Sequence, residues 1–294
     1  MRKISTLLVL LASLIGFQYL NAETKQALLI GISDYGNVKE DPNKWSNING
    51  ANDIDLLTPL FEEQGFAVAR LKDNQATKKG ITNALDRLVK NSKKGDVVYI
   101  HFSMHGQPFE DLNGDEEDGW DEALIPFDAQ MQYKKGIYEG NNHLLDDELE
   151  IYFDDIRTKL GPTGQLFVVM DACHSGGASR GDDDHVRGTR EGFTRSGKDY
   201  MPDRTKETND YFMVNTKVGQ SPVKFIEACR SYQVNREIRD AETDNWYGSL
   251  SFYIAQAMKN NKTVGSTEWI ETIRQGMSNN RKLRKQNMVI EESK

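Results

Sequence analysis

The chain has 294 residues, of which 37% are hydrophobic and 28% charged, so it can bury the core of one large α/β domain or two small ones. Its 24 Gly and 7 Pro residues exclude collagen-like and low-complexity classes. The formal net charge of −8 argues against a broad nucleic-acid-binding surface and favours cationic partners. Two cysteines, Cys173 and Cys229, are too few for a disulfide framework, although they could form one bridge.

The first 22 residues are typical of a secretory signal peptide. Arg2 and Lys3 precede an uncharged stretch, 4–20, and Ala22 offers a small residue for cleavage. An uncleaved membrane anchor is the alternative, but the stretch is shorter than the ~20 residues of a spanning helix. We therefore expect a secreted or periplasmic protein with no membrane attachment after cleavage, in which residues 23–294 form a single domain.

Short apolar runs alternate with amphipathic segments along the chain. The expected strands are 26–32, 66–71, 96–103, 165–171 and 223–229, all predicted to be buried. The expected helices are 51–64, 77–93, 146–160, 249–259 and 267–277. Thr77 is a candidate N-cap, and Pro59 should kink the first helix or end it early. This alternation predicts an α/β fold with a mainly parallel sheet, helices on both faces, and ligand sites at the carboxyl ends of the strands.

Two polar segments interrupt the alternation. Residues 110–122 are dense in carboxylates and are not expected to contribute to a core. Residues 174–222 are rich in Arg and Lys without clear periodicity, which predicts a long, mobile basic loop.

Two reactive side chains follow predicted strands at the same edge of the sheet. His105 comes after the strand 96–103 and Cys173 after the strand 165–171. Because a thiol needs a base to become a nucleophile, the pair predicts a Cys/His dyad. Taken singly, the cysteine could be a small buried hydrophobe and the histidine a turn residue. His174 is a rival base, and His101 lies inside the strand and should be packed.

The segments 101–106 (His-Phe-Ser-Met-His-Gly) and 171–176 (Asp-Ala-Cys-His-Ser-Gly) resemble the two catalytic motifs of caspase-like cysteine peptidases, specifically bacterial type I metacaspases of peptidase family C14. The acidic run 111–121 and the segments 50–53, 145–148 and 247–251 also resemble that family, over roughly residues 25–260. The resemblance implies a three-layer caspase-like sandwich. It also implies that Cys173 is the nucleophile, that His105 is the general base and acid, and that the backbone N–H groups of Gly106 and Cys173 form the oxyanion hole. Met104 stands where the family usually has Gly.

The resemblance further implies an acidic pocket for the residue before the cleaved bond, built from Asp53, Ser103 and Asp171 and accepting Arg or Lys. Without the resemblance, Asp53 would be interpreted as a carboxylate at a helix N-terminus and Asp171 as a turn residue. Asp specificity, as in true caspases, would place like charges together.

Calcium is the only cofactor that the resemblance implies, and we expect no organic cofactor. The implied ligands are Asp121, Asp146 and Asp147, whose hard oxygen atoms suit Ca²⁺. The fourth family ligand corresponds to Arg180, so a carboxylate of 182–184 would have to substitute. An EF-hand fails because Glu116 occupies the required Gly position. A solvated acidic loop is the alternative without metal.

The expected function is a Ca²⁺-stimulated, self-processing cysteine endopeptidase that acts as a monomer on proteins or peptides with Arg or Lys at the cleaved bond. Self-cleavage is expected after Arg180, Arg187, Arg190 or Arg195. The rivals are a clostripain- or gingipain-like peptidase and a non-catalytic Ca²⁺-binding adaptor with the same fold. A bridge between the two cysteines would silence the nucleophile, so we predict that Cys173 is a thiol in the active protein.

Overall fold

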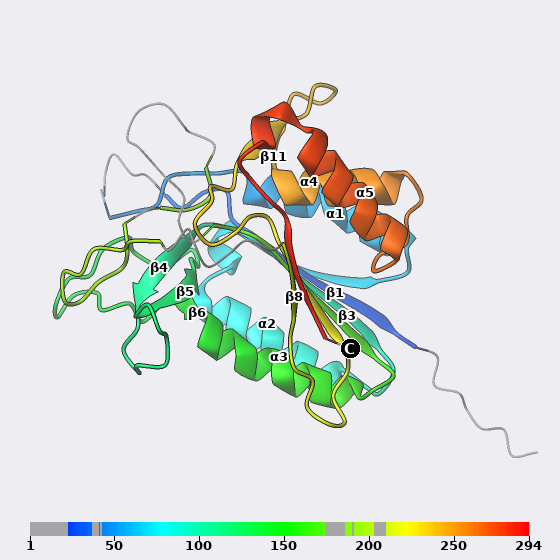
Figure 1. The fold of residues 1–294 in the computed structure, drawn as a ribbon, viewed down its shortest axis with the longest axis horizontal. Helices are drawn as coiled ribbons and strands as arrows, with labels where there is room; N and C mark the ends of the chain where they lie inside the picture. The colour runs from blue at the N-terminus through cyan, green and yellow to red at the C-terminus, as the bar shows by residue number, and fades with distance from the viewer. Residues whose placement is uncertain are drawn as a thin grey trace, which may run out of the picture.

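A seven-stranded, mainly parallel sheet forms the centre of the computed structural model (Figure 1). Its strands, from one edge to the other, are β2 (Ala67–Lys72), β1 (Lys25–Gly31), β3 (Val97–Ser103), β7 (Gln165–Asp171), β9 (Val223–Glu227), β12 (Val289–Glu292) and β8 (Tyr211–Met213). The first five strands pair in parallel, and β12 runs antiparallel to β9. The five predicted strands are therefore all present, and they lie side by side.

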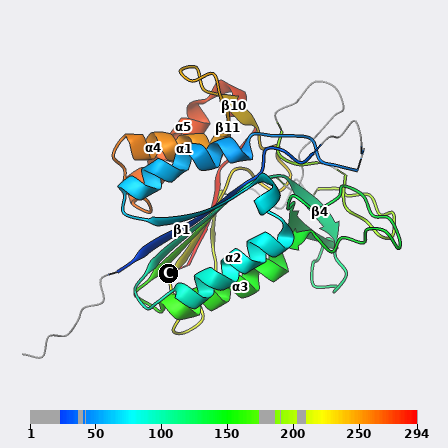
Figure 2. The same ribbon diagram turned by 180° about the vertical axis from the view of Figure 1, so that it is seen from behind.

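Helices cover both faces of this sheet (Figures 1 and 2). One face carries α1 (Gly50–Glu63), α4 (Ser249–Lys259) and α5 (Thr267–Asn279), and the other carries α2 (Lys78–Asn91) and α3 (Asp146–Leu160). Each helical layer packs on its own apolar cluster, and alternate residues of the central strands contribute to each cluster: Ile100 of β3 points to one and Tyr99 to the other. The predicted three-layer α/β architecture is confirmed.

Smaller elements lie at the carboxyl end of the sheet. An antiparallel sheet contains β4 (Gly106–Glu110), β5 (Trp120–Leu124) and β6 (Leu144–Leu145), and a hairpin contains β10 (Glu237–Arg239) and β11 (Trp246–Gly248). Two 3₁₀ turns, Asp73–Gln75 and Arg281–Leu283, complete the elements. None of these strands, nor β8 or β12, follows from the apolar pattern.

Local predictions for the helices and the edge strand have mixed outcomes. Thr77 caps α2, since its Oγ1 accepts a hydrogen bond from Gly80 N at 3.0 Å. Pro59 lies inside α1 on an exposed position, so an early end is wrong; water can satisfy the carbonyl that the missing N–H leaves without a donor. None of the six residues of β2 is buried, because β2 is an edge strand, so its predicted burial is wrong, although Phe66 just before it is buried.

Both polar segments contain more structure than their composition predicts. In 110–122, Trp120 and Asp121 are buried because β5 pairs with β4. In 174–222, Arg187 and Phe193 are buried, and residues 211–213 form β8. A single mobile loop is therefore a wrong description of the described part of that segment.

The structure describes residues 23–36, 41, 43–173, 186–189, 191–202 and 210–293. The expected signal peptide lies outside these residues, as do His174, Arg180, the carboxylates of 182–184, and Arg190. Among the described residues, none of the helices combines the length and the apolar character that a membrane span requires.

Candidate active site

His105 and Cys173 follow the two central strands at equivalent positions. β3 and β7 are paired in parallel with Ser103 opposite Asp171, and His105 follows Ser103 at the same offset as Cys173 follows Asp171. Both side chains are buried, at 1% and 0% exposure. The fold therefore brings the predicted dyad residues to one edge of the sheet.

His105 is held in one tautomer by its surroundings. Its Nε2 lies 2.9 Å from the carbonyl oxygen of Ser46, which can only accept a hydrogen bond, so Nε2 carries the proton. The Nδ1 atom is buried and has no hydrogen-bond partner among the described residues. Burial lowers the pKa of His105 to about 4, against the opposing effect of the Ser46 carbonyl. The imidazole is therefore neutral at pH 7 and has a basic lone pair on Nδ1.

Two aromatic rings fix the imidazole plane. The ring centroids of Tyr35 and Trp45 lie 5.2 and 4.9 Å from that of His105. The Tyr35 hydroxyl also accepts a hydrogen bond from His105 N at 3.1 Å and donates one to Ile125 O at 3.0 Å. Met104 packs into an apolar cluster, so it does not line the cleft beside His105.

The two cysteines lie together at the ends of β7 and β9. Both are thiols, and the Cys173 thiol donates a hydrogen bond to the carbonyl oxygen of Gln233 at 2.6 Å, with Cys229 Sγ 3.7 Å from the same oxygen. A hydrogen bond with Cys173, together with burial, raises the pKa of the Cys229 thiol well above its usual range. Cys229 therefore stays protonated at pH 7.

His101 is packed, as predicted. It is fully buried between Tyr99, whose hydroxyl lies 3.2 Å from Nδ1, and Ser251, whose Oγ lies 2.9 Å from Nε2. Burial lowers its pKa to about 4. Both ring nitrogens therefore contact neighbouring hydroxyl groups inside the protein.

The three predicted pocket residues converge at the sheet edge. Ser103 ends β3, Asp171 ends β7, and Asp53 lies in the first turn of α1, where its Oδ2 accepts a hydrogen bond from Ser103 Oγ at 2.6 Å. Asp171 Oδ2 accepts from Ser251 N at 2.8 Å and Oγ at 2.6 Å. All three predicted residues are fully buried. Asp53 does lie at a helix N-terminus, whereas Asp171 is the last residue of a buried strand and not a turn residue.

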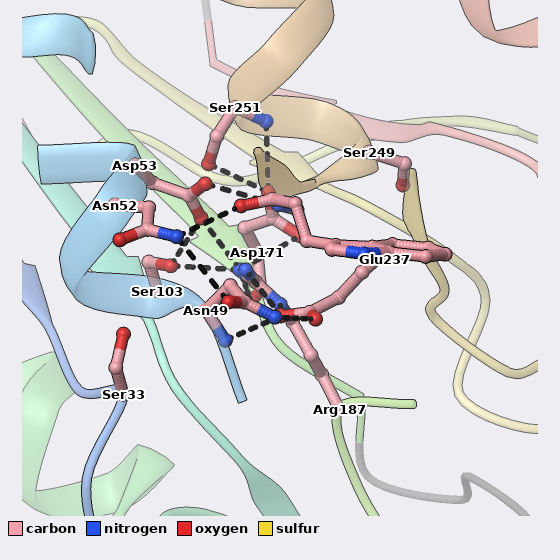
Figure 3. Close-up of polar contacts among 12 residues, drawn as sticks. Ser33, Asn49, Asn52, Asp53, Ser103, Asp171, Arg187, Glu237, Ser249 and Ser251 are labelled. Atoms are coloured by element: carbon pink, nitrogen blue, oxygen red, sulfur yellow. Dashed lines mark hydrogen bonds and ion pairs between the residues drawn. The ribbon is translucent and has the colours of Figure 1, made fainter. Parts of the chain in front are cut away.

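An arginine of the chain itself occupies this pocket (Figure 3). The Nη1 atom of Arg187 lies 2.8 Å from Asp53 Oδ2, 2.7 Å from Ser103 Oγ and 3.5 Å from Asp171 Oδ1. The side chain has no solvent exposure. Burial acts to lower the pKa of Arg187, but the adjacent carboxylates raise it above its ordinary value, so the guanidinium is charged.

A third carboxylate, Glu237, completes the pocket from β10. Its Oε1 accepts from Nε and Nη2 of Arg187 at 3.0 and 2.9 Å. One guanidinium thus faces three carboxyl groups. Burial raises the pKa of Asp53 to about 7; Arg187 opposes this rise, whereas Asp171 and Glu237 reinforce it.

Gly248 leaves the space that the guanidinium fills. A Cβ built on Gly248 would lie 2.3 Å from Arg187 Nη1 and 2.2 Å from Asp171 Oδ2, so no side chain fits there. Its N–H donates to Asp53 Oδ1 at 3.0 Å. The glycine at this position is therefore part of the pocket wall.

The backbone around Arg187 pairs with the residues that precede β10. Arg187 N donates to Asn235 O at 3.0 Å, and Val186 forms an antiparallel bridge with Arg236. The next residue, Gly188, lies against Cys173: an added Cβ would be 3.2 Å from the Cβ of Cys173 and 2.0 Å from its carbonyl oxygen. Gly188, the residue after the buried Arg187, thus lies against the backbone and the Cβ of Cys173.

The acidic run contains a cluster of oxygen ligands. Carboxylate oxygens of Asp111, Asp115 and Asp121 lie within 4.8 Å of one another. Burial raises the pKa of Asp121 to about 7, and Asp146 is the neighbouring carboxylate that reinforces this most. Asp147 opens α3 beside Asp146 and accepts from Asn113 Nδ2 at 2.9 Å. An all-oxygen donor set around an electrostatically unfavourable buried carboxylate fits a hard divalent cation.

Sequence reasoning missed two features of the pocket. Arg187 was expected only as a cleavage site in a mobile loop, and Glu237 was not expected at all. Nothing in the local pattern marks either residue, because each lies in a polar stretch and is buried by segments distant in sequence. The segment 247–251, which resembles the family, was the available signal for the pocket wall.

Comparisons with known proteins identify the family of the chain. The sequence profile described as "Metacaspase, peptidase C14 domain" matches residues 13–180. Metacaspase-1 of Eremothecium gossypii is 33% identical over 161 residues, which is 52% of this chain and 32% of that protein. Metacaspase-1B of Aspergillus fumigatus is 35% identical over 164 residues, or 52% of this chain and 36% of that protein. The matched part of the chain thus spans about a third of the length of these curated relatives.

A solved structure shares the fold at low sequence identity. The crystal structure of protein GSU0716 from Geobacter sulfurreducens superposes with a TM-score of 0.60 at 20% identity, covering 92% of this chain and 93% of that one. This likeness supports the architecture alone. Because the profile match spans more than half of the sequence and includes both motifs up to Cys173, the chain belongs to the metacaspase family of peptidase C14 domains.

Proposed function

We propose that this protein is a cysteine endopeptidase that cleaves peptide bonds after Arg or Lys, with Cys173 as nucleophile and His105 as general base and acid. The observation that carries the proposal is Arg187, which is buried in a carboxylate-lined pocket while Gly188 lies against Cys173. These contacts support the proposal that the pocket accepts the basic residue before a cleaved bond.

The reaction follows from the states of the two side chains. Nδ1 of neutral His105 accepts the Cys173 proton, and the thiolate attacks the carbonyl carbon of the residue in the pocket. The peptide C–N bond breaks as the imidazolium returns its proton to the leaving amine, which leaves a thioester on Cys173. Water then attacks the thioester as His105 takes its proton, and the carboxylate product and the thiol are released.

Oxyanion stabilisation is proposed for the backbone N–H groups of Gly106 and Cys173. Gly106 is buried and directly follows His105 as the first residue of β4. Backbone donors fixed in a buried site stabilise the developing negative charge without needing to reorganise.

The basic preference follows from burial and charge. A neutral or acidic side chain would leave the carboxylates of Asp53 and Asp171 buried without a cation, which costs ~2–5 kcal/mol. Such a cost lowers kcat/KM by about 30-fold or more. An aspartate in this pocket would add a further like charge.

Self-processing is proposed at the Arg187–Gly188 bond. Among the four arginines that the sequence offered, Arg187 is the one whose described position is inside the pocket. Arg195 lies elsewhere, with its backbone N–H bonded to Glu110 Oε2 at 2.7 Å. Before cleavage, Arg187 blocks the pocket, so this cut also admits other substrates.

Stimulation by Ca²⁺ is proposed through the acidic cluster. Asp121 would hold the ion together with Asp111 and Asp115, and Asp146 and Asp147 border the cluster. When bound, the ion would supply positive charge that offsets the repulsion among these carboxylates. Because β5 carries Asp121 and pairs with β4, which begins at Gly106, this charge change acts on the sheet beside the dyad.

We also propose that the protein is a monomer, that a leader of residues 1–22 directs its export, that it has no membrane attachment after the leader is removed, and that it uses no organic cofactor.

Fluorogenic peptides ending in Arg, Lys, Asp or Gln, assayed with Ca²⁺ and with chelator, test the activity. Cleavage after Arg or Lys that Cys173→Ala abolishes supports the proposal. Cleavage after Asp would overturn the pocket assignment, and no cleavage of any peptide would favour the non-catalytic adaptor.

A clostripain- or gingipain-like peptidase shares the dyad and the basic preference. The profile match to metacaspases and the acidic cluster at Asp121 disfavour that alternative.

A further inference from the structure

The β10–β11 hairpin supplies a pocket carboxylate beyond the three positions that the family resemblance implies. Glu237 is 4% exposed and lies opposite Gly248 in the hairpin. We infer that Glu237 is a specificity-determining residue that makes this pocket selective for arginine over lysine. The inference rests on the proposed function and deepens it.

The Glu237 carboxylate is also held by contacts other than those with Arg187. Asn49, the residue that precedes α1, donates to it twice, from N to Oε1 at 2.7 Å and from Nδ2 to Oε2 at 2.5 Å. These two contacts orient the carboxylate toward the edge of the guanidinium (Figure 3). A preorganised acceptor selects among ligands because it does not move to suit a poorer one.

The contacts of Arg187 divide into two sets. Nη1 alone contacts Asp53, Ser103 and the carbonyl oxygen of Asp171, the last at 3.3 Å. Nε and Nη2 donate hydrogen bonds to Glu237. The planar fork of arginine therefore reaches both sides of the pocket at once.

A lysine side chain has one nitrogen and cannot donate hydrogen bonds to both sets of acceptors. If its ammonium replaces Nη1 beside Asp53, a methylene lies where arginine has Nε, and Glu237 loses both donors. If the ammonium moves toward Glu237, the contacts with Asp53 and Ser103 weaken. Charge-assisted contacts of this kind correspond to about 10-fold to 100-fold in binding or rate.

The first test measures kcat/KM of the processed enzyme for two peptides that differ only in Arg or Lys before the cleaved bond. We expect the wild type to favour Arg by at least about 10-fold, and Glu237→Gln to reduce this ratio by about 10-fold or more. Glu242→Gln, at an exposed position in the same hairpin turn, is the control and should keep the wild-type ratio. An unchanged ratio in E237Q would overturn the inference while leaving the proposed function intact.

A binding test separates the inference from catalysis. The double variant Cys173→Ala/Arg187→Gly removes turnover and the internal arginine. Calorimetry then compares agmatine, which ends in a guanidinium, with cadaverine, which ends in an ammonium. Tighter binding of agmatine that E237Q removes supports the inference. Equal binding of both amines, or binding of neither, contradicts the inference. If the double variant prefers agmatine but the wild-type enzyme cleaves no peptide, the proposed function is contradicted and the inference is not.

Glu237→Asp guards against misfolding of the first variant. If E237Q shows no melting transition, Glu237→Asp replaces it in the test. The aspartate keeps the negative charge that Asn49 binds, but its side chain is shorter, so its carboxylate lies farther from the guanidinium. It should also lower the Arg-to-Lys ratio, and retention of the wild-type ratio would contradict the inference.

Discussion

The pocket around Arg187 and the acidic run 110–122 are both clusters of carboxylates, but they differ in burial and in whether a cation of the chain pairs with them. In the pocket the carboxylates are buried around a guanidinium that the chain itself provides. In the acidic run half of the eight carboxylates are exposed, and the buried Asp121 faces only like charges among the groups that shift its pKa. Burying a carboxylate is costly unless a cation pairs with it. The pocket has its cation in Arg187, and the proposal of a Ca²⁺ site rests on the absence of a cation among the groups that shift the pKa of Asp121.

The largest expected effect comes from removing the nucleophile beside the pocket. Cys173→Ala should lower peptide cleavage by at least about 10³-fold, because the remaining site only binds and orients the substrate. It should also leave the chain whole. Cys229→Ala is the matched control, since the raised pKa keeps that thiol protonated, and it should retain activity. Equal losses in both variants would contradict the assignment of Cys173.

The sequence predicts the site residues that follow apolar strands, but it does not predict those that only the tertiary fold buries. The strands that end at Ser103 and Asp171 follow from apolar runs, because strands covered on both faces are continuously hydrophobic. His105 and Cys173 follow from those strand ends. Arg187 does not, because its burial depends on a cavity that α1, two strand ends and a hairpin build together. Glu237 likewise has no local pattern, and only the tertiary fold brings it opposite Gly248.

The next prediction removes the internal cation of the pocket. In a Cys173→Ala background, which prevents self-cleavage, Arg187→Ala should lower the free energy of unfolding by about 3–5 kcal/mol, because three carboxyl groups lose their shared partner. Urea denaturation at pH 7.5 measures this. Arg195→Ala, an exposed arginine of the same segment, should change stability by less than about 0.5 kcal/mol.

The pH dependence of this variant sharpens the comparison. Asp53 already has a pKa raised to about 7, and loss of Arg187 removes the influence that lowers it. A carboxyl group whose folded pKa exceeds its unfolded value binds protons more strongly in the folded state, so the variant should regain stability as the pH falls from about 7 toward 4. A destabilisation that is constant over this range would contradict a charge-based cause.

The acidic run should respond to an added cation instead. Ca²⁺ at about 100 times its dissociation constant should stabilise the Cys173→Ala protein by about 2.7 kcal/mol, which thermal melting detects. Asp121→Asn should abolish this shift. Asp86→Asn, at an exposed position on α2, is the control. A Ca²⁺ shift that survives in D121N would contradict the assignment of the cluster.

The smallest effect concerns the protonation of the buried histidines. Burial lowers the pKa of His101 and His105 to about 4 and that of His143 to about 3. These imidazoles should stay neutral until the pH falls to about 4, and the stability that depends on their neutrality is lost as the pH falls from about 6.5 through that value. Nitrogen-15 NMR of the imidazoles measures both the titrations and the tautomers. A proton on Nδ1 rather than Nε2 of His105 at pH 7 would contradict its role as the base.

The central claim is that Arg187 lies in the active site as the chain's own substrate. Intact-mass and N-terminal sequencing of the protein incubated with Ca²⁺ test this most directly. The expected result is a new fragment that begins at Gly188 in the wild type, no such fragment in Cys173→Ala, and none in Arg187→Ala. A fragment beginning at Gly188 in the Cys173→Ala chain, or a wild-type protein that processes itself at other bonds while Arg187–Gly188 stays whole, would contradict it.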